Sequence, residues 1–288
     1  MVVNVNMIIK VPQSKIKLQI LATPIGNLDE ITFRAINALK ECECILCEDT
    51  RVTSKLLTKL NIHNKELISY QKFNENDKVE LALNKIKTKK TILCSDAGYP
   101  CLSDPGYALV NKCYEENIAI EVINGPSSII HSVVVSGLNL NNFYFHGFLP
   151  HSGSQRKERL KELLDIKVPI VFFESVYRIK ESLKDIKDIF NDPYLVVCRE
   201  LTKLNETIYR GRYDQIINEI DERGEFVIVV QKEQHKKISQ ELKEIIKEVN
   251  QMIKDGMPLK KASKQVALKY DLQASYVYNA VVESKKVK

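Results

Sequence analysis

Short apolar runs alternate with amphipathic stretches along most of the chain. The apolar runs predict buried strands at 18–23, 44–47, 91–94, 118–123, 143–147, 168–173, 194–198 and 226–230. Between them, apolar residues at helical spacing predict helices near 29–41, 76–87, 105–117, 127–137, 154–165, 178–190 and 213–222. Strands that alternate with helices are typical of βαβ units and a mostly parallel sheet, so the predicted fold class is α/β.

The polar stretch at 137–142 is the predicted boundary between two α/β domains. We expect an N-terminal extension at 1–17, a first domain at 18–138 and a second at 143–235. An amphipathic helix at 239–254 and two further helices, at 258–269 and 274–283, then predict a small helix-turn-helix-like unit over 236–288.

The net charge is concentrated in this last unit. The whole chain has 43 Lys and Arg against 37 Asp and Glu, a net of +6, and residues 236–288 alone hold 12 Lys, no Arg and 6 acidic residues. A basic unit indicates a polyanionic partner, with nucleic acid the leading candidate, and a merely solvated helix surface is the alternative. We expect Lys260, Lys261 and Lys264 to contact an RNA backbone.

Composition and motifs exclude several classes. The sequence has no apolar run of the ~18 residues that a membrane span needs and no secretory signal pattern. Its odd number of cysteines, 7, favours a reducing cytosol, so we expect a cytoplasmic protein without a membrane partner. Neither a G-x-G-x-x-G nor a P-loop motif is present. Cys42, Cys44 and Cys47 lack a matching pair at zinc spacing, so buried thiols are expected and no metal.

The loops that follow the strands of the first domain carry the candidate chemistry, because ligands of parallel α/β sheets bind at the carboxyl ends of the strands. These loops are Thr23–Asn27, Glu48–Arg51, Asp96–Gly106 and Asn124–Ser128. Their glycines permit close backbone approach to a ligand, and their prolines fix the loop conformation. The alternative for each loop alone is a well-capped turn, but their common edge predicts a ligand site.

The ordered motifs TPIGN, EDTR, SDAG-x-P-x-x-SDPG, NGPSS, F-x-GFLP, ES-x-x-R, RELTK-x-x-E and GEFVIVV resemble the tetrapyrrole-methylase superfamily over about residues 18–283. The resemblance is strongest to its members that 2′-O-methylate a cytidine in the decoding region of small-subunit ribosomal RNA. It implies S-adenosylmethionine bound in a cleft between the two domains, no metal, a homodimer, and small-subunit ribosomal RNA or the assembled small subunit as substrate. Two motifs depart from the family pattern, since PGPSA is NGPSS here and ESPHR is ESVYR.

The motifs also suggest roles for individual residues. Cofactor contacts are expected from Pro24, Asp96, Gly98, Pro100, Ser103, Asp104, Gly106, Ser127, Gly147 and Phe148. A ribose 2′-hydroxyl needs a proton acceptor, for which Lys203 and Glu200 are candidates, with Arg199 holding a carboxylate or phosphate. A structural ion-pair cluster is the alternative for these three.

RNA-facing roles are expected for a second group of side chains. Glu48 or Asp49 would orient the substrate, Arg51 would bind a backbone phosphate, and Arg178 is a further RNA contact. Tyr177, where the family pattern has a histidine, either stacks on a base or packs inside the protein.

Two other functions stay open. A methyltransferase of this fold could act on a tetrapyrrole or another small substrate, although the basic tail argues against a porphyrinoid. A non-catalytic RNA-binding homologue is the other alternative, against which the intact loops weigh.

Overall fold

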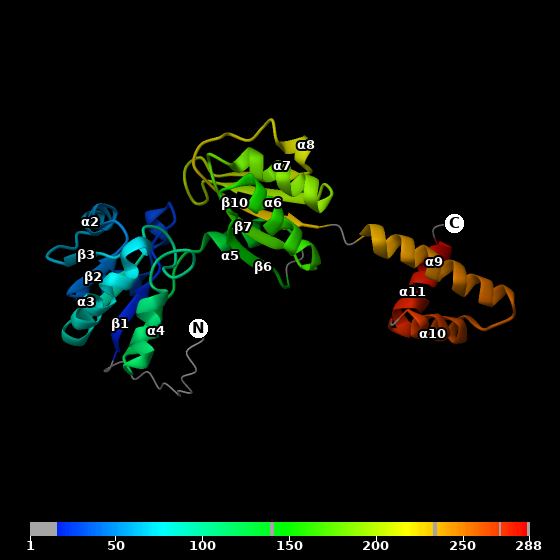
Figure 1. Ribbon diagram of the computed structural model, residues 1–288, viewed down its shortest axis with the longest axis horizontal. Helices are drawn as coiled ribbons and strands as arrows, with labels where there is room; N and C mark the ends of the chain where they lie inside the picture. The colour runs from blue at the N-terminus through cyan, green and yellow to red at the C-terminus, as the bar shows by residue number, and fades with distance from the viewer. Residues whose placement is uncertain (1–15, 139–140, 233–234, 271, 287–288) are drawn as a thin grey trace. The chain divides into compact units, whose positions relative to one another are not determined.

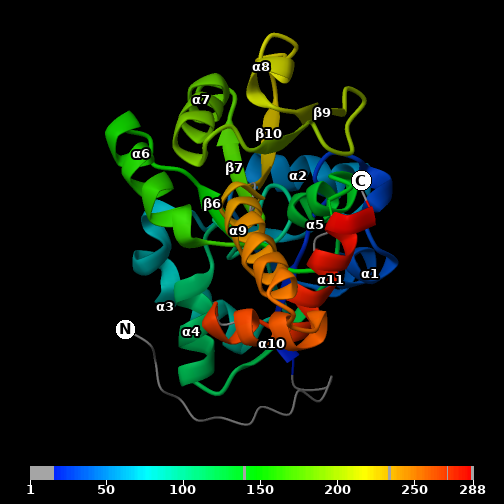
Figure 2. The ribbon, with the colours of Figure 1, turned by 90° about the vertical axis from the view of Figure 1, so that its right-hand side faces the viewer.

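The computed structural model describes residues 16–138, 141–232, 235–270 and 272–286. The chain divides into two compact units, and the division falls between Gln231 and Lys232 in the sequence. The first unit holds two five-stranded sheets and the second unit is helical (Figures 1 and 2). The described residues therefore confirm the predicted α/β class with an added C-terminal helical unit.

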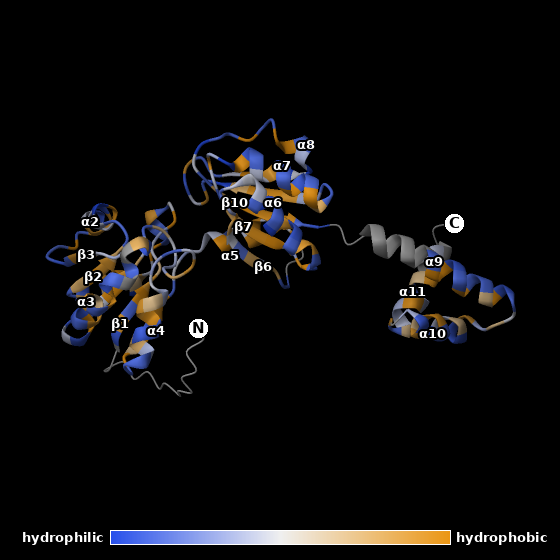
Figure 3. Cartoon of the chain, in the orientation of Figure 1, coloured by the Kyte–Doolittle hydropathy of each residue, from blue (hydrophilic) through white to orange (hydrophobic). Residues whose placement is uncertain are grey.

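The first sheet is fully parallel. Its strand order is β3 (Glu66–Ser69), β2 (Cys44–Cys47), β4 (Thr91–Cys94), β1 (Ile16–Leu21) and β5 (Ala119–Ile123). Helices α1 (Phe33–Glu41) and α2 (Thr50–Lys59) pack on one face, and α3 (Glu75–Thr88) and α4 (Tyr107–Glu115) on the other. Because both faces are covered, β2 and β4 are mainly apolar and are buried along their whole length. Figure 3 colours the chain by hydropathy, with hydrophobic residues in orange.

The second sheet is mixed. Its order is β6 (Tyr144–Phe148), β7 (Ile170–Ser175), β10 (Glu225–Gln231), β8 (Tyr194–Arg199) and β9 (Thr207–Gly211). Only β6 and β7 are parallel, since β8 and β9 form a hairpin and β10 runs antiparallel to both of its neighbours. The expectation of a mostly parallel sheet thus holds for the first sheet and is wrong for the second.

Helices also cover both faces of the second sheet. Helices α6 (Gly153–Glu162), α7 (Ile179–Phe190) and α8 (Tyr213–Ile216) contribute to the core on one face. Helix α5 (Ser128–Val135) follows β5 of the first sheet, yet its Ile129 packs on the other face beside Val171 and Val227. The chain therefore crosses to the second sheet before β6 begins, which brings the Asn124–Ser128 loop between the sheets.

Several elements differ from the sequence expectation. Strand β1 begins at Ile16, and the rest of the predicted extension lies outside the described residues. The sequence analysis does not predict helix α2 (Thr50–Lys59) or strands β3 and β9. The two strands are short and mostly half-buried, so they lack a strong apolar run. Single-turn 3-10 helices lie at Leu28–Glu30, Lys72–Asn74 and Leu163–Asp165.

The expected buried thiols are confirmed. Cys42, Cys44 and Cys47 are buried and free. Burial raises the pKa of the Cys42 and Cys44 thiols to about 11, so they stay protonated at neutral pH. They pack as small apolar side chains in the core around the first sheet.

The C-terminal unit has a core of its own. Helices α9 (His235–Lys254), α10 (Leu259–Lys269) and α11 (Ala274–Lys286) bury Ile245, Val249, Ala262, Val266, Val277 and Val281 among them. Lys260, Lys261 and Lys264 are exposed on α10, as their spacing from the apolar residues predicted. None of the described helices is long and apolar enough to cross a membrane.

Candidate active site

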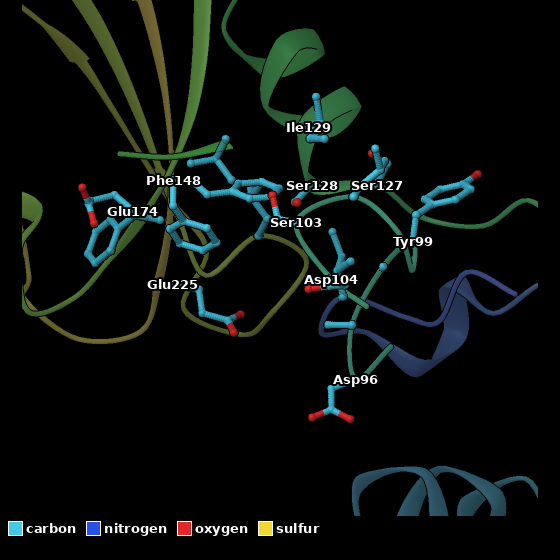
Figure 4. Close-up of a pocket in the computed structure, with 18 of the residues that line it drawn as sticks. Asp96, Tyr99, Ser103, Asp104, Ser127, Ser128, Ile129, Phe148, Glu174 and Glu225 are labelled. Atoms are coloured by element: carbon cyan, nitrogen blue, oxygen red, sulfur yellow. The ribbon is translucent and has the colours of Figure 1, made fainter. Parts of the chain in front are cut away.

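A cavity of about 500 Å³ lies where the loops of the first sheet meet the second sheet. Figure 4 shows Asp96, Tyr99 and Asp104 on the side of the first sheet, with Phe148 and Glu225 on the side of the second. Its volume lies within the ~300–1,000 Å³ of small-molecule sites. The cavity is therefore large enough for a nucleoside-sized ligand.

The Asp96–Gly106 loop forms one wall and has an unusual backbone. Cys101 and Ser103 both have a φ of 70°, in the left-handed region that residues with a side chain rarely adopt. The carboxylate of Glu75 accepts the N–H groups of Gly106 and Ala108 at 2.9 and 2.8 Å, which secures the start of α4. A distant side chain thus replaces a local helix cap and fixes this end of the loop.

Gly98 lies at the point where this loop contacts the Thr23–Asn27 loop. Its backbone pairs with Thr23 through hydrogen bonds of 2.9 and 3.1 Å, and its φ is 76°. A Cβ at this position would meet only the Ile25 side chain, at 3.4 Å, although Gly98 lines the cavity. The space beside its Cα is therefore cavity space that any side chain would occupy.

Three carboxyl groups line the same wall. Burial, together with Glu48 and Asp96, raises the pKa of Asp104 to about 6. Burial and Asp96 likewise raise the pKa of Glu48, and burial raises the pKa of Asp96, opposed by an N–H donated from Asp49 at 3.1 Å. Grouped carboxylates favour a cationic ligand and disfavour a phosphate.

Asp49 and Arg51 lie beside this wall but do not form it. Asp49 caps α2 by accepting the Arg51 N–H at 2.8 Å, and its carboxylate pairs with the Arg51 guanidinium at 2.6 Å. These bonds lower the pKa of Asp49 to about 2. The side chain of Arg51 is 85% exposed, so it is accessible to a large substrate.

Arg199 has internal partners only. Its side chain is 8% exposed, donates to the Arg223 carbonyl at 2.6 Å and the Asn205 carbonyl at 3.2 Å, and pairs with Asp221 at 3.0 Å. It therefore joins the loop between β8 and β9 to the loop before β10, and it positions the Glu200–Glu206 segment.

Lys203 sits between two carboxylates. Its Nζ lies 2.9 Å from Glu200 Oε1 and 2.9 Å from Glu225 Oε2, and Glu225 lines the cavity. Burial would lower the pKa of Lys203, but these bonds outweigh it and raise the pKa. Burial would raise the pKa of Glu200, but the bonds from Lys203 and from the Glu225 N–H outweigh burial and lower the pKa. Lys203 is thus a fixed cation next to the cavity.

The Lys203 loop also touches a loop of the first sheet. The Asn27 N–H donates to Thr202 Oγ1 at 3.0 Å, and a Cβ on Gly26 would overlap the Lys203 side chain. Glycine is required here by this close approach of two loops. The contact brings the Glu200–Glu206 loop of the second sheet to the Thr23–Asn27 loop of the first.

Arg178 faces the protein interior. Its side chain is 11% exposed and pairs with buried Glu174 at 2.8 Å. It also donates to Ser175 Oγ at 3.3 Å and to the Leu149 carbonyl at 3.2 Å. These bonds hold the turn after β7 rather than presenting the guanidinium to solvent.

The cavity collects part of the predicted site. The predicted residues that line it are Glu48, Asp96, Gly98, Ser103, Asp104, Ser127 and Phe148. Those outside its lining are Pro24, Pro100, Gly106, Gly147, Asp49, Arg51, Arg178, Arg199, Glu200, Lys203, Lys260, Lys261 and Lys264. Of these, Gly147 lies at the edge, since a Cβ there would be 3.2 Å from Ser103 Oγ.

Sequence reasoning missed a wall made by β10. Gly224, Glu225, Phe226 and Val227 line the cavity at the start of this strand. A search restricted to the carboxyl ends of strands cannot find them, because β10 is antiparallel and its amino end lies at the carboxyl edge of β7. The GEFVIVV motif was the available signal.

Similarity to known proteins shows the fold and the family of this chain. A solved structure of diphthine synthase matches 74% of this chain and 88% of its own, with a TM-score of 0.59 and 15% identity, which shows a shared fold. The family model for tetrapyrrole (corrin/porphyrin) methylases matches residues 17–217. The chain belongs to this family.

Curated relatives share much more sequence. A Mycoplasma genitalium protein named ribosomal RNA small subunit methyltransferase I is 38% identical over 274 residues, which cover 93% of this chain and 99% of that protein. A Thermotoga maritima protein of the same name is 41% identical over 218 residues, 74% of this chain and 97% of that protein. About a quarter of this chain therefore has no counterpart in the Thermotoga relative.

The cavity suits S-adenosylmethionine, the methyl donor that a methyltransferase family implies. Carboxylates on one wall match its positive sulfonium and ammonium groups, and the space beside Gly98 admits a close ligand. Apolar side chains from the second sheet and α5, among them Leu201, Val227 and Ile129, suit an adenine ring. Among the residues that the structure describes, no group of His, Cys, Asp and Glu is arranged for a metal ion.

Proposed function

We propose that the protein transfers the methyl group of S-adenosylmethionine to the ribose 2′-hydroxyl of a cytidine in the decoding region of small-subunit ribosomal RNA. The observation that carries the proposal is the carboxylate-lined cavity between the two sheets, in a chain of the methylase family that is 38% identical to a relative named for this RNA. The sequence motifs supply the finer substrate, a cytidine 2′-hydroxyl.

The donor supplies an electrophilic methyl group, and the protein has to position and desolvate the reactants. We assign binding of the cationic donor to the wall formed by Asp96, Gly98 and Asp104, with Ser127 also in the cavity lining. The other predicted cofactor residues (Pro24, Pro100, Ser103, Gly106, Gly147 and Phe148) then shape or line this wall.

The 2′-hydroxyl must lose a proton as the methyl group arrives. Lys203 keeps its own proton, because both of its carboxylate partners raise its pKa. We therefore assign Lys203 to stabilising negative charge on the attacking oxygen, and proton acceptance to a carboxylate of the cavity wall. Glu48 is the candidate on the wall next to exposed Arg51.

An RNA substrate fits the remaining charges. Exposed Arg51 and the exposed lysines of α10 are suited to backbone phosphates, whereas the cavity wall repels them. Such a substrate agrees with a cytoplasmic protein, and the family resemblance implies that it acts as a homodimer on the small subunit.

Incubation with labelled S-adenosylmethionine tests the proposal. Small ribosomal subunits, naked small-subunit ribosomal RNA, large subunits and a tetrapyrrole precursor are offered in parallel, and the acceptor of the label is identified. We expect label in the small-subunit RNA only. Label in the tetrapyrrole would assign the protein to a small substrate, and no label with intact donor binding would indicate a non-catalytic homologue.

A further inference from the structure

A solvent-exposed aromatic ring stands at the mouth of the cavity. Glu174, Ser175 and Val176 line the cavity at the end of β7, and the next residue, Tyr177, is 92% exposed. Burying a tyrosine removes about 150–250 Å² of surface from water, a gain that this side chain forgoes completely. Of the two roles open for Tyr177 in the sequence, packing is therefore excluded.

The turn that carries Tyr177 is tightly held. Buried Glu174 accepts the Ser175 N–H at 2.7 Å and the Ser182 hydroxyl at 2.5 Å, and it pairs with Arg178. Arg178 in turn binds the Leu149 carbonyl at the end of β6. The backbone on both sides of Tyr177 is thus anchored, so the ring is displayed from a fixed position rather than from a loose loop.

A second aromatic ring lies on the neighbouring strand. Phe148 ends β6, lines the cavity, is 52% exposed and lies 5.4 Å from the ring of Phe173. Strands β6 and β7 are parallel neighbours, so Phe148 and Tyr177 follow the same carboxyl edge. This edge presents aromatic rings beside Glu174 and Glu225, which are paired with Arg178 and Lys203, whereas the wall of Asp96 and Asp104 on the other side is acidic (Figure 4).

The contrast between the two sides limits what can bind here. Phosphates are disfavoured next to Glu48, Asp96 and Asp104, so a nucleic acid that enters is better held by its bases than by its backbone. Bases of single-stranded RNA stack on exposed tyrosine rings, and this contact tolerates any base.

We propose that Tyr177 stacks on a base of the substrate RNA and so holds the target nucleotide at the cavity mouth. The inference rests on the proposed function and assigns Tyr177 a positioning role, with no part in donor binding. The Glu174–Arg178 pair holds the turn that carries Tyr177. The buried arginine thus supports RNA binding without touching the RNA itself.

Variants at this position separate stacking from other contacts. Tyr177→Ala should raise the KM for small ribosomal subunits, and the Kd for labelled small-subunit ribosomal RNA, by about 5- to 100-fold. Tyr177→Phe keeps the ring and should stay near wild type, whereas Tyr177→Leu, apolar but not planar, should resemble Tyr177→Ala. Donor affinity and melting temperature should not change. Phe33→Ala removes another exposed aromatic, 88% accessible and outside the cavity lining, and should have no effect.

The outcomes distinguish this inference from the proposed function. Wild-type KM and RNA affinity in Tyr177→Ala would overturn the stacking role while methylation of the small subunit stands. Equal losses in Tyr177→Ala and Tyr177→Phe would also overturn it, because the hydroxyl would then make the contact. A wild-type protein that neither binds nor methylates small-subunit RNA would overturn both.

Discussion

Gly98 lines the cavity at a position where an added side chain would take up space that we assign to the ligand. Gly98→Ala places a methyl group in cavity space and also strains a backbone with φ of 76°. We expect donor affinity to fall at least tenfold and stability to fall by about 1 kcal/mol from the left-handed backbone. Calorimetry measures the first and thermal unfolding the second.

Gly256 supplies the matched control for this variant. Its φ is 92° and a Cβ there would meet nothing within 4 Å, so Gly256→Ala carries backbone strain without entering the cavity. It should lose stability but keep donor affinity. Unchanged donor binding in Gly98→Ala would remove this glycine from the site.

Lys203 distinguishes two ways of handling the 2′-hydroxyl. As a fixed cation, it should tolerate Lys203→Arg with partial activity, whereas Lys203→Ala should lower kcat about 10²–10³-fold, as loss of one charge-stabilising donor does. If Lys203 acted as a neutral base instead, Lys203→Arg and Lys203→Ala would lose activity equally. Single-turnover rates with saturating donor decide between them, and near-normal activity of Lys203→Ala would reduce the cluster to a structural ion pair.

Asp104 carries a charge that the fold opposes. Its pKa of about 6 in the folded protein lies above the ordinary value. The contribution of this group to the free energy of unfolding is therefore complete below about pH 4, where the carboxyl is protonated, and is lost as the pH rises through 6. Asp104→Asn should therefore raise stability by roughly 1 kcal/mol at pH 8, after allowance for partial solvent screening, and leave it unchanged at pH 3.5. Melting curves at both pH values test this, with exposed Asp165→Asn as a control. Equal stability of wild type and Asp104→Asn at pH 8 would contradict it.

At the scale of elements, the sequence predicts what burial imposes and misses what topology imposes. Strands β2 and β4 can be predicted from their short, mainly apolar runs, because both faces of their sheet are covered. The loops at their carboxyl ends then follow from the rule for parallel sheets, which is why Glu48, Asp96 and Asp104 could be predicted.

The missed features have a common physical origin. Strand order and direction depend on distant partners, so the placement of antiparallel β10 between β7 and β8, and with it Gly224 and Glu225 at the cavity, has no local signal. The partners of Arg178 and Arg199 are equally non-local. Charge at a strand end suggested ligand contacts for both, and the structure instead gives them buried internal bonds.

At the scale of the whole molecule, the charge is divided from the cavity. Lys260, Lys261 and Lys264 are exposed on α10 of the helical unit, whereas the cavity belongs wholly to the first unit. Replacing all three lysines by glutamine should weaken binding of small-subunit RNA and reduce its salt dependence by ~0.7–0.9 per lost phosphate contact. Donor affinity should not change. A wild-type salt slope in the triple variant would leave these lysines as a solvated face.

In the proposed function, the protein methylates a ribose of small-subunit RNA at the cavity. Nucleoside mass spectrometry after reaction of undermethylated small subunits with S-adenosylmethionine tests it most directly. We predict one new 2′-O-methylcytidine per subunit, formed by the wild type and not by Gly98→Ala at limiting donor. A methyl group on a base, on a nucleotide other than cytidine, or on no RNA at all would contradict the account.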